Sequence, residues 1–287
     1  MSTLDRFSLS GRTAIVTGAS YGLGVAFART LAEAGANVVL AARSVDKLQQ
    51  VAPIVEGYGV KALVQECDVT DPAAVVRTVE NAWEAFGRVD VLVNNAGVIA
   101  ELGIMPERTP DALFATTVAT NLNGLFTFCR EVGGRQLADG KGGSIVNVAS
   151  IAGLGAQPHF PAAYQASKAA VINLTRNLAA SWAKRGVRVN ALCPGWFPSD
   201  MTGPFFAMPT FWARIEEMSP MKRVGLEHEL DAALLFMASD ASSFMTGSTV
   251  VIDGGISSTL GASDYSPDMF AAMVEVAGEY GTPIGNA

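Results

Sequence analysis

Short apolar runs rich in β-branched residues alternate along the chain with longer segments of helical periodicity. The runs that predict strands are 13–17, 37–42, 61–66, 89–93, 144–149, 187–192 and 248–252. The segments that predict helices are 24–34, 44–56, one that opens at Pro72, 110–138, 161–185 and 227–237. Strands that alternate with helices in this way pair in parallel through right-handed crossovers. The pattern therefore predicts an α/β fold with one doubly wound parallel sheet and helices on both faces.

The chain before residue 257 shows no repeat, no low-complexity tract and no linker between domains, so residues 1–257 are predicted to form one domain. Within it, the aromatic and Met-rich segment 196–221 is predicted to be a substrate lid. Residues 258–287 form a C-terminal extension, in which Ser266-Pro267-Asp268 is typical of a helix start. A helix over 267–280 is marginal alone in water, so we expect its apolar face to dock against protein.

Composition narrows the class of protein. Apolar residues make up 49% of the 287 positions and charged residues 16%, which allows a large core. The formal net charge of −7 argues against nucleic acid or an anionic membrane as a partner. No signal-like core and no membrane-length apolar run is apparent, so a cytoplasmic protein is expected. Two histidines and three separated cysteines make a metal site, a His-based triad or disulfides hard to build.

A glycine-rich turn, Gly18-Ala-Ser-Tyr-Gly22-Leu-Gly24, stands between the first strand and the first helix. Such a turn lets backbone N–H groups approach a pyrophosphate at the positive end of the helix. The alternative is a tight turn whose glycines serve packing only. The second strand ends at Ala42, where dinucleotide folds place an acid for the ribose 2′-hydroxyl, and Arg43 follows. This favours NADP over NAD, unless Arg43 is simply a solvated strand end.

Tyr164 and Lys168 are four residues apart in a helical run, so both lie on one helix face. An ammonium beside a phenol favours phenolate, and we expect it to lower the pKa of Tyr164 from its ordinary value of about 10. Tyr164 is thus a candidate acid/base, although surface helices also carry this pair by chance. Asn121 lies inside the long helix 110–138, where Asn is unfavourable. It either faces solvent or interrupts the hydrogen-bond ladder to hold a water.

In this order and spacing, the motifs resemble the short-chain dehydrogenases/reductases over about residues 8–257. The matching pieces are Thr17-Gly18-x-x-x-Gly22-x-Gly24, Asn94-Asn95-Ala96-Gly97, Asn121, Ser150, Tyr164-x-x-x-Lys168, Pro194-Gly195 and Ser199. The resemblance implies a Rossmann fold with a doubly wound seven-stranded parallel sheet. It also implies NADP, or else NAD, as cofactor and a homo-oligomer, a tetramer or a dimer, built through the helices that carry Asn121 and Tyr164.

The resemblance implies catalytic roles for four side chains. Tyr164 would give a proton to a substrate carbonyl, or take one from an alcohol. Lys168 would lower the Tyr164 pKa and bond the nicotinamide ribose, and Ser150 would hydrogen-bond the substrate oxygen. Asn121 would hold a water that links Lys168 to solvent.

The cofactor would contact the glycine-rich turn, several strand ends and the loop after strand 187–192. The residues implied are Gly18, Ser20, Tyr21, Gly22, Leu23, Gly24, Arg43, Asp68, Val69, Asn95, Ala96, Gly97, Tyr164, Lys168, Pro194, Gly195, Phe197 and Ser199. Two departures from the family pattern lie in the last loop, where Ser199 replaces the usual Thr and Pro198 removes an N–H. A third is Tyr21, which is not basic, so that the preference for NADP depends mainly on Arg43.

These features favour an NAD(P)-dependent oxidoreductase that interconverts a secondary alcohol and a ketone. The alternatives are a 3-oxoacyl-[acyl-carrier-protein] reductase, with Arg130, Arg135 and Lys141 as a basic patch, a sugar or polyol dehydrogenase, and a non-catalytic dinucleotide-binding protein. The aromatic and Met side chains of the lid segment predict a partly apolar small-molecule substrate. Free sugars would then be poor substrates.

Overall fold

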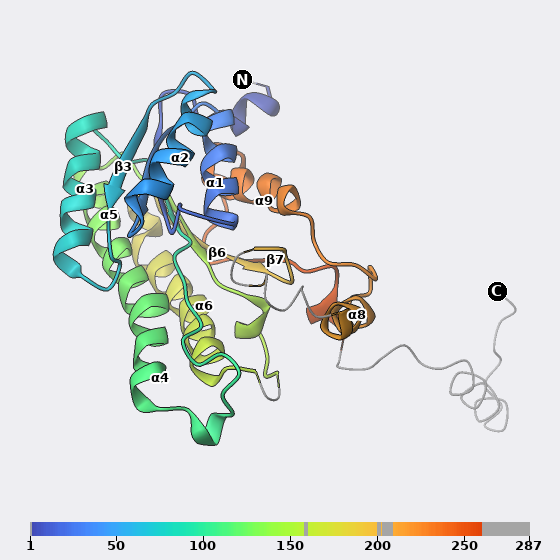
Figure 1. The fold of residues 1–287 in the computed structure, drawn as a ribbon. Helices are drawn as coiled ribbons and strands as arrows, with labels where there is room; N and C mark the ends of the chain where they lie inside the picture. The colour runs from blue at the N-terminus through green and yellow to red at the C-terminus, as the bar shows by residue number, and fades with distance from the viewer. Residues whose placement is uncertain (1, 158–159, 200–201, 203–208, 260–287) are drawn as a thin grey trace, which may run out of the picture.

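The computed structural model describes residues 2–157, 160–199, 202 and 209–259 (Figure 1). The strands are β1 (Thr13–Thr17), β2 (Asn37–Ala42), β3 (Ala62–Glu66), β4 (Val91–Asn94), β5 (Gly143–Val148), β6 (Val187–Pro194) and β7 (Thr249–Ile252). The helices are α1 (Leu23–Glu33), α2 (Val45–Glu56), α3 (Pro72–Phe86), α4 (Asp111–Val118), α5 (Leu125–Asp139), α6 (Ala162–Trp182), α8 (Pro209–Met218) and α9 (Asp231–Ala238). The predicted strands are all present, with ends that differ by at most two residues.

The strands form one seven-stranded sheet in the order β3-β2-β1-β4-β5-β6-β7. Every neighbouring pair runs parallel. From β1 the chain builds outward to β3 on one side, then returns and builds from β4 to β7 on the other. The doubly wound parallel fold predicted from the sequence is therefore confirmed, and the two halves of the sheet separate between β1 and β4.

Two layers of helices cover the sheet, with α1, α2 and α9 on one face and α3, α5 and α6 on the other (Figure 1). Strand β1 explains why both faces need cover, because all five of its residues are buried. Side chains alternate along a strand, so Ala14 and Val16 enter the first core and Ile15 enters the second. The result is a rigid central layer whose strand ends are held in register.

The predicted helix 110–138 is divided. Its middle, Ala119–Gly124, is a π-helix that separates α4 from α5, and Asn121 lies in it with no exposed surface. The prediction that Asn121 interrupts the ladder is confirmed, and the solvent-facing alternative is wrong. The lid segment 196–221 contains a helix, α8, that the sequence did not predict. The predicted helix 267–280 lies outside the described residues.

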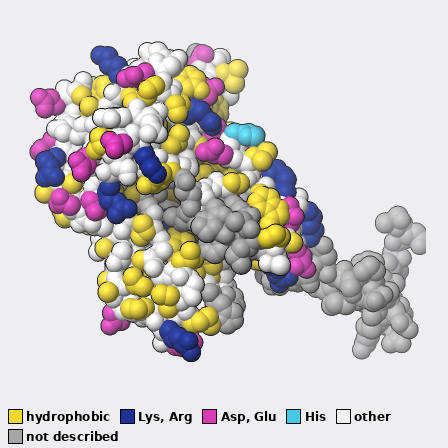
Figure 2. All heavy atoms as spheres, in the orientation of Figure 1, with side chains coloured by type: hydrophobic (Ala, Val, Ile, Leu, Met, Phe, Trp, Pro, Cys, Tyr) yellow, Lys and Arg dark blue, Asp and Glu magenta, His cyan; other side chains and the backbone are white. Residues whose placement is uncertain are grey.

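The stretch Asp111–Asp139 has the length and composition of a membrane-crossing helix, with mean hydropathy 1.2, which corrects the expectation that no such run exists. Its apolar character has a second explanation in the core, because Phe128 and Val132 pack there fully buried. Figure 2 shows hydrophobic side chains gathered in the part of the molecule where Figure 1 places α4. Phe114 and Phe126 are among the exposed large hydrophobic residues.

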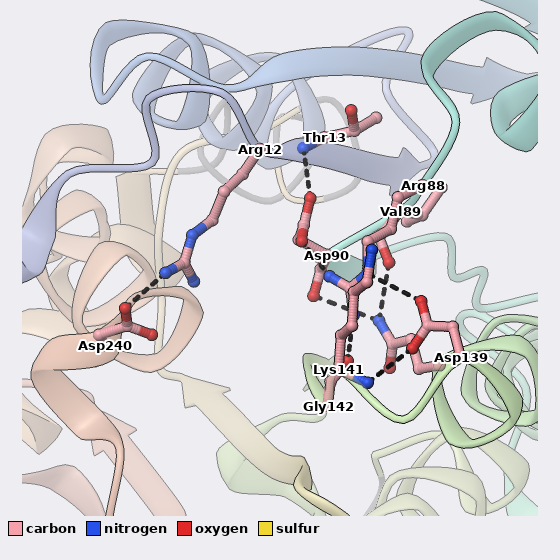
Figure 3. A network of polar contacts seen from close by, with 10 residues as sticks. Arg12, Thr13, Arg88, Val89, Asp90, Asp139, Lys141, Gly142 and Asp240 are labelled. Atoms are coloured by element: carbon pink, nitrogen blue, oxygen red, sulfur yellow. Dashed lines mark hydrogen bonds and ion pairs between the residues drawn. The ribbon is translucent and has the colours of Figure 1, made fainter.

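The amino ends of the strands are held by a polar network (Figure 3). Asp90, just before β4, accepts the backbone N–H of Thr13 at 2.9 Å. Arg88 pairs with Asp90 and, at 2.8 Å, with Asp139 at the end of α5. The buried Gln136 side chain donates to the carbonyls of Val89 and Asp90, both at 3.2 Å. These contacts fix β1, β4 and α5 to one another at the edge opposite the site described next.

Candidate active site

A cleft with a volume of about 430 Å³ opens at the carboxyl ends of the strands, where the sheet divides between β1 and β4. Ligands bind at this place in open α/β sheets. The cleft is lined by every residue that the sequence assigned to the cofactor: Gly18, Ser20, Tyr21, Gly22, Leu23, Gly24, Arg43, Asp68, Val69, Asn95, Ala96, Gly97, Tyr164, Lys168, Pro194, Gly195, Phe197 and Ser199. Ser150 also lines it. Asn121 does not, because it is buried behind the cleft wall.

The glycine-rich turn is built for close approach of backbone to backbone. Gly18 has a positive φ of 65°, and a Cβ on it would lie 2.9 Å from the Cα of Ala96. A Cβ on Gly24 would lie 2.1 Å from the Gly18 carbonyl oxygen. Asn95 closes the turn, since its amide donates to the Thr17 carbonyl at 3.0 Å. The glycines therefore serve close packing in this turn, and the same turn places the start of α1 at the cleft.

The end of the cleft beside β2 is basic and hydroxyl-rich. Arg43 and Ser44 line it, and the Nζ of Lys47 lies 4.0 Å from the centroid of the Tyr21 ring. The hydroxyls of Ser44 and Ser20 lower the pKa of the Tyr21 phenol, with a smaller contribution from the two cations. Lys47 is a cation that the sequence analysis missed. The signal was its position four residues after Arg43, in the first turn of the next helix.

Across from Arg43, Asp68 follows β3. Its carboxylate accepts the Thr70 backbone N–H at 2.9 Å and the Thr70 hydroxyl at 2.7 Å, which together lower its pKa. The acid is thus held ionised in a local turn, and it faces the cleft with Val69.

Tyr164 and Lys168 project from the first turns of α6 toward Ser150, which follows β5. Burial raises the pKa of Tyr164, and a hydrogen bond with Ser150 offsets this only in part. The expectation that Lys168 lowers the Tyr164 pKa is therefore wrong for this arrangement. The ammonium lies 5.7 Å from the ring centroid, and it donates to the Val148 carbonyl at 2.8 Å. Burial also lowers the pKa of Lys168 to about 8.

Asn121 binds the loop that follows β4. Its amide oxygen accepts the Val98 N–H at 2.8 Å, and its amide nitrogen donates to the Val98 carbonyl at 3.0 Å. The same nitrogen donates to the hydroxyl of Ser167 at 3.2 Å. A Cβ on Gly97 would lie 3.4 Å from the Asn121 oxygen and 3.5 Å from the Lys168 Nζ. Asn121 and Lys168 therefore lie on the same side of Gly97, where a Cβ would touch both at ordinary contact distances.

Several cleft residues escaped the sequence analysis. They are Ala42, Ser44, Cys67, Thr70, Val98, Thr116, Thr120, Val148, Ala149 and Thr202. Thr116 and Thr120 had a detectable signal, since they are four residues apart on the helix that carries Asn121. Thr202 had none, because its role depends on tertiary contacts. Its hydroxyl donates to the Phe197 carbonyl at 2.7 Å and lies 3.0 Å from the Ser199 hydroxyl, which fixes that loop.

Aromatic rings flank Tyr164 on the lid side. The Phe160 ring packs edge-on against Tyr164, with centroids 5.9 Å apart, and against Trp196, with centroids 6.1 Å apart. Phe197 is only 4% exposed and belongs to the core as well as to the cleft. Met201, Phe205, Phe206, Met208 and the side chain of Phe211 lie outside the described residues, so lining of the pocket by the whole lid stays a prediction.

Within the described ranges, no group of three His, Cys, Asp or Glu side chains is placed to hold a metal ion. Cys67, Cys129 and Cys193 are buried free thiols, as their reading as small apolar residues predicted.

Comparison with known proteins places this fold and cleft in a family. A family model described as Enoyl-(Acyl carrier protein) reductase matches residues 18–257. Galactitol 2-dehydrogenase (L-tagatose-forming) of Cereibacter sphaeroides is 42% identical over 87% of this chain and 96% of its own. 3beta-hydroxysteroid dehydrogenase 1 of Eggerthella lenta is 38% identical over 86% and 94%. The crystal structure of a gluconate 5-dehydrogenase from Burkholderia cenocepacia, in complex with NADP and tartrate, is 34% identical, with TM-score 0.85 over 90% of this chain and 100% of that one.

The chain therefore belongs to the short-chain dehydrogenase/reductase family, as its motifs indicated. It is an NAD(P)-dependent oxidoreductase that acts on CH–OH groups and interconverts an alcohol and a ketone.

Proposed function

We propose that Tyr164 is the acid/base of this reaction and that Ser150 and Lys168 support it. The observation that carries the proposal is the convergence of the three side chains, from β5 and α6, on one end of a cleft whose other end is the glycine-rich turn. Asn121, behind them, would hold a water that connects Lys168 to solvent. Its position beside Gly97, on the same side as the Lys168 ammonium, supports this role.

The residues of the cleft fit a nicotinamide dinucleotide. Cβ atoms at Gly18 and Gly24 would fill the turn, and the start of α1, which has no side-chain cap, offers N–H groups to a pyrophosphate. When bound, the cofactor supplies or accepts the hydride at the substrate carbon. In the reductive direction, Tyr164 gives its phenolic proton to the carbonyl oxygen while Ser150 hydrogen-bonds that oxygen. The Ser150 hydroxyl, whose hydrogen bond lowers the Tyr164 pKa, then stabilises the phenolate until a proton returns, and oxidation runs the same steps backward.

NADP is the cofactor that the site favours. Arg43 lines the cleft and carries the planar guanidinium that binds phosphate well, and Lys47, over the Tyr21 ring, adds a second cation at this end. Ala42 offers no carboxylate to a ribose 2′-hydroxyl. The solved relative that contains NADP adds support from outside this chain.

The substrate is a small alcohol or ketone that packs against the aromatic pair Phe160 and Trp196. A polyol is the second candidate, because the hydroxyls of Thr116, Thr120 and Thr202 line the cleft. Among the relatives named above, the galactitol and gluconate dehydrogenases favour a polyol and the steroid dehydrogenase favours an apolar substrate. The acyl-carrier alternative has the family model's description in its favour, whereas two of its patch residues, Arg130 and Arg135, pair with Glu131 and Glu80. The prediction that free sugars are poor substrates stands, and the ratio of kcat/KM for cyclic and aryl ketones to that for polyols tests it.

The enzyme is a homo-oligomer in this proposal. Support comes from the exposed side chains of Phe114 and Phe126, on the two helices that flank the π-helix. An exposed apolar surface on α4 and α5 suits contact with a second copy of the chain. Light scattering at micromolar concentration tests this, and a monomer would contradict it.

The acid/base role is tested with Tyr164→Phe, which removes the hydroxyl and keeps the ring. We expect turnover of the best ketone to fall about 10²–10⁴-fold, the usual contribution of a general acid. NADPH affinity should stay within about twofold, because Tyr164 is not part of the phosphate-binding turn. Turnover close to that of the parent would remove Tyr164 from the mechanism.

A further inference from the structure

Glu101 is a fully buried carboxylate that the mechanism above does not use. It lies in the loop after β4, has no exposed surface and does not line the cleft. Its Oε1 accepts the backbone N–H of Tyr164 at 2.9 Å, and its Oε2 accepts the Thr117 hydroxyl at 2.5 Å. A buried carboxylate without hydrogen bonds is costly, so both contacts matter to its placement. One of them reaches the backbone of the proposed acid/base.

Helix α6 needs this contact because it has no cap of its own. The first N–H groups of a helix have no partner within the helix, and a Ser, Thr, Asp or Asn at the N-cap usually accepts one of them. The N-cap of α6 is Pro161, whose side chain accepts nothing. Glu101 supplies the missing acceptor from a distant part of the chain, at the third residue of the helix. A negative charge is also favourable at this end of a helix dipole.

The same loop is tied to the neighbouring helix. The Ala100 N–H donates to the Thr117 hydroxyl at 3.0 Å, so Thr117 on α4 links the loop backbone to the Glu101 carboxylate. Helix α4 lies beside α6 (Figure 1). At the carbonyl of Tyr164 itself, the Ser167 hydroxyl donates a hydrogen bond of 2.8 Å. The backbone of Tyr164 is thus held at its N–H by Glu101 and at its carbonyl by Ser167.

We infer that Glu101 is a positioning residue, which fixes the first turn of α6 so that the Tyr164 phenol stays aligned with the substrate oxygen. The inference rests on the proposed role of Tyr164. Without this cap, the turn that carries Tyr164 is free to shift while the glycine-rich turn and Arg43 are untouched. A misplacement of about 1 Å can cost about 100-fold in rate. The chemical step should therefore suffer while cofactor binding does not.

Glu101→Met tests this, because Met has a similar shape and no acceptor. We expect kcat, counted per NADPH-binding site, to fall about 10–100-fold, while the dissociation constant of NADPH changes less than about twofold. Glu101→Gln is the conservative rescue, since its amide oxygen still accepts the Tyr164 N–H. It should keep kcat within about threefold of the parent. A parental kcat in Glu101→Met, or equal slowing in both variants, overturns the inference.

Gln136→Met is the matched control. Gln136 is also fully buried, and its side chain is close to that of Glu101 in shape. Its amide nitrogen donates to the Val89 carbonyl at the amino end of the sheet. It should lower the melting temperature without changing kcat per binding site. If it slows catalysis as much as Glu101→Met does, loss of buried hydrogen bonds anywhere explains the effect and the inference fails.

The double variant Glu101→Met/Tyr164→Phe separates this inference from the proposed function. If Glu101 acts through the phenol, the double variant is no slower than Tyr164→Phe alone, because the two effects are not additive. If Glu101→Met slows the Tyr164→Phe variant by the same factor as it slows the parent, the inference is overturned. A parental rate in Tyr164→Phe alone overturns the proposed function instead.

Should Glu101→Met not fold, Thr117→Val gives the same test in a milder form. It removes the hydroxyl that holds the Glu101 Oε2 and leaves the carboxylate in place. We expect a slowing of about threefold that vanishes in the Tyr164→Phe background. No slowing, or slowing that persists there, overturns the inference.

Discussion

The two ends of the parallel sheet treat their polar residues differently. At the amino end, charges are paired with each other, as Arg88 is with Asp90 and Asp139, and the backbone of β1 is bonded through Asp90 (Figure 3). At the carboxyl end, Lys168 is 4% exposed and its Nζ donates to a single carbonyl, that of Val148, within the described contacts. One end satisfies its charges internally, and the other holds a buried cation at the edge of a cleft.

This difference indicates that the amino end of the sheet contributes mainly to stability and the carboxyl end mainly to binding and chemistry. Burial lowers the pKa of Lys168 to about 8 and raises that of Tyr164, so the carboxyl end carries an electrostatic cost. At the amino end, burial also lowers the pKa of Arg188, but its guanidinium donates to several acceptors, and the ion pairs of Arg88 are partly exposed. We expect substitutions at the carboxyl end to change binding and rate, and those at the amino end to change stability. Four experiments test or refine this contrast.

The two largest effects, of similar size, are expected at the carboxyl end, and the first is that of Gly24→Ala. The new Cβ would lie 2.1 Å from the Gly18 carbonyl oxygen, so the turn must open. Overpacking of this kind costs about 1–3 kcal/mol, and we expect NADPH affinity to fall by about 5–150-fold. Gly134→Ala on α5 is the control, because a Cβ there meets nothing within 4 Å. Fluorescence titration with NADPH compares the two, and equal affinities would contradict the role of the turn.

The next effect concerns cofactor choice. Arg43→Ala removes a guanidinium from the basic end of the cleft, and a charged hydrogen bond is worth about 1.5–3 kcal/mol. NADPH affinity should fall about 10–150-fold, while NADH affinity changes little. Lys61→Ala serves as control, because this exposed cation precedes β3 at the amino end of the sheet. Equal affinity of the parent enzyme for NADPH and NADH, measured by titration, would refute the preference.

At the amino end, Asp90→Asn should reduce stability and leave catalysis unchanged. Asn can still accept the Thr13 N–H, but the pair with Arg88 is lost. We expect a loss of about 1–3 kcal/mol, which corresponds to several degrees in melting temperature for a chain of this size. The kcat per binding site should match that of the parent. A variant with normal melting temperature and reduced kcat would reverse the contrast between the two ends.

The smallest effect is a pH dependence of stability from Lys168. Its pKa is about 8 in the folded chain, against an ordinary value of 10.5. Between these values the unfolded chain binds more protons, so this group makes the protein more stable as pH rises through that window. Lys168→Met lacks the group. The melting temperature of the parent relative to Lys168→Met should therefore rise from pH 7 to pH 9.5, and a constant or falling difference would contradict the depressed pKa.

Much of the fold was predictable because the central strands are apolar runs that are buried on both faces. The residues that line the cleft were largely predictable as a set, because most of them follow strands and the carboxyl ends of parallel strands meet at one edge. The sign of the Tyr164 pKa shift was not. The spacing of Tyr164 and Lys168 predicted a lowered pKa, whereas the burial that raises it comes from the cleft walls.

The order of strands and helices, the glycine-rich turn and the placement of Tyr164 and Lys168 on one helix face all follow from the local sequence. These features depend on periodicity and on steric limits of nearby residues. Contacts between distant parts of the chain set the π-helix at Asn121, the position of Lys47 beside Tyr21 and the cap that Glu101 provides to α6. Each of these depends on partners far apart in the chain. Glu101 shows the reason, because an acid in a loop is ordinary until folding removes its water and brings a helix end to it.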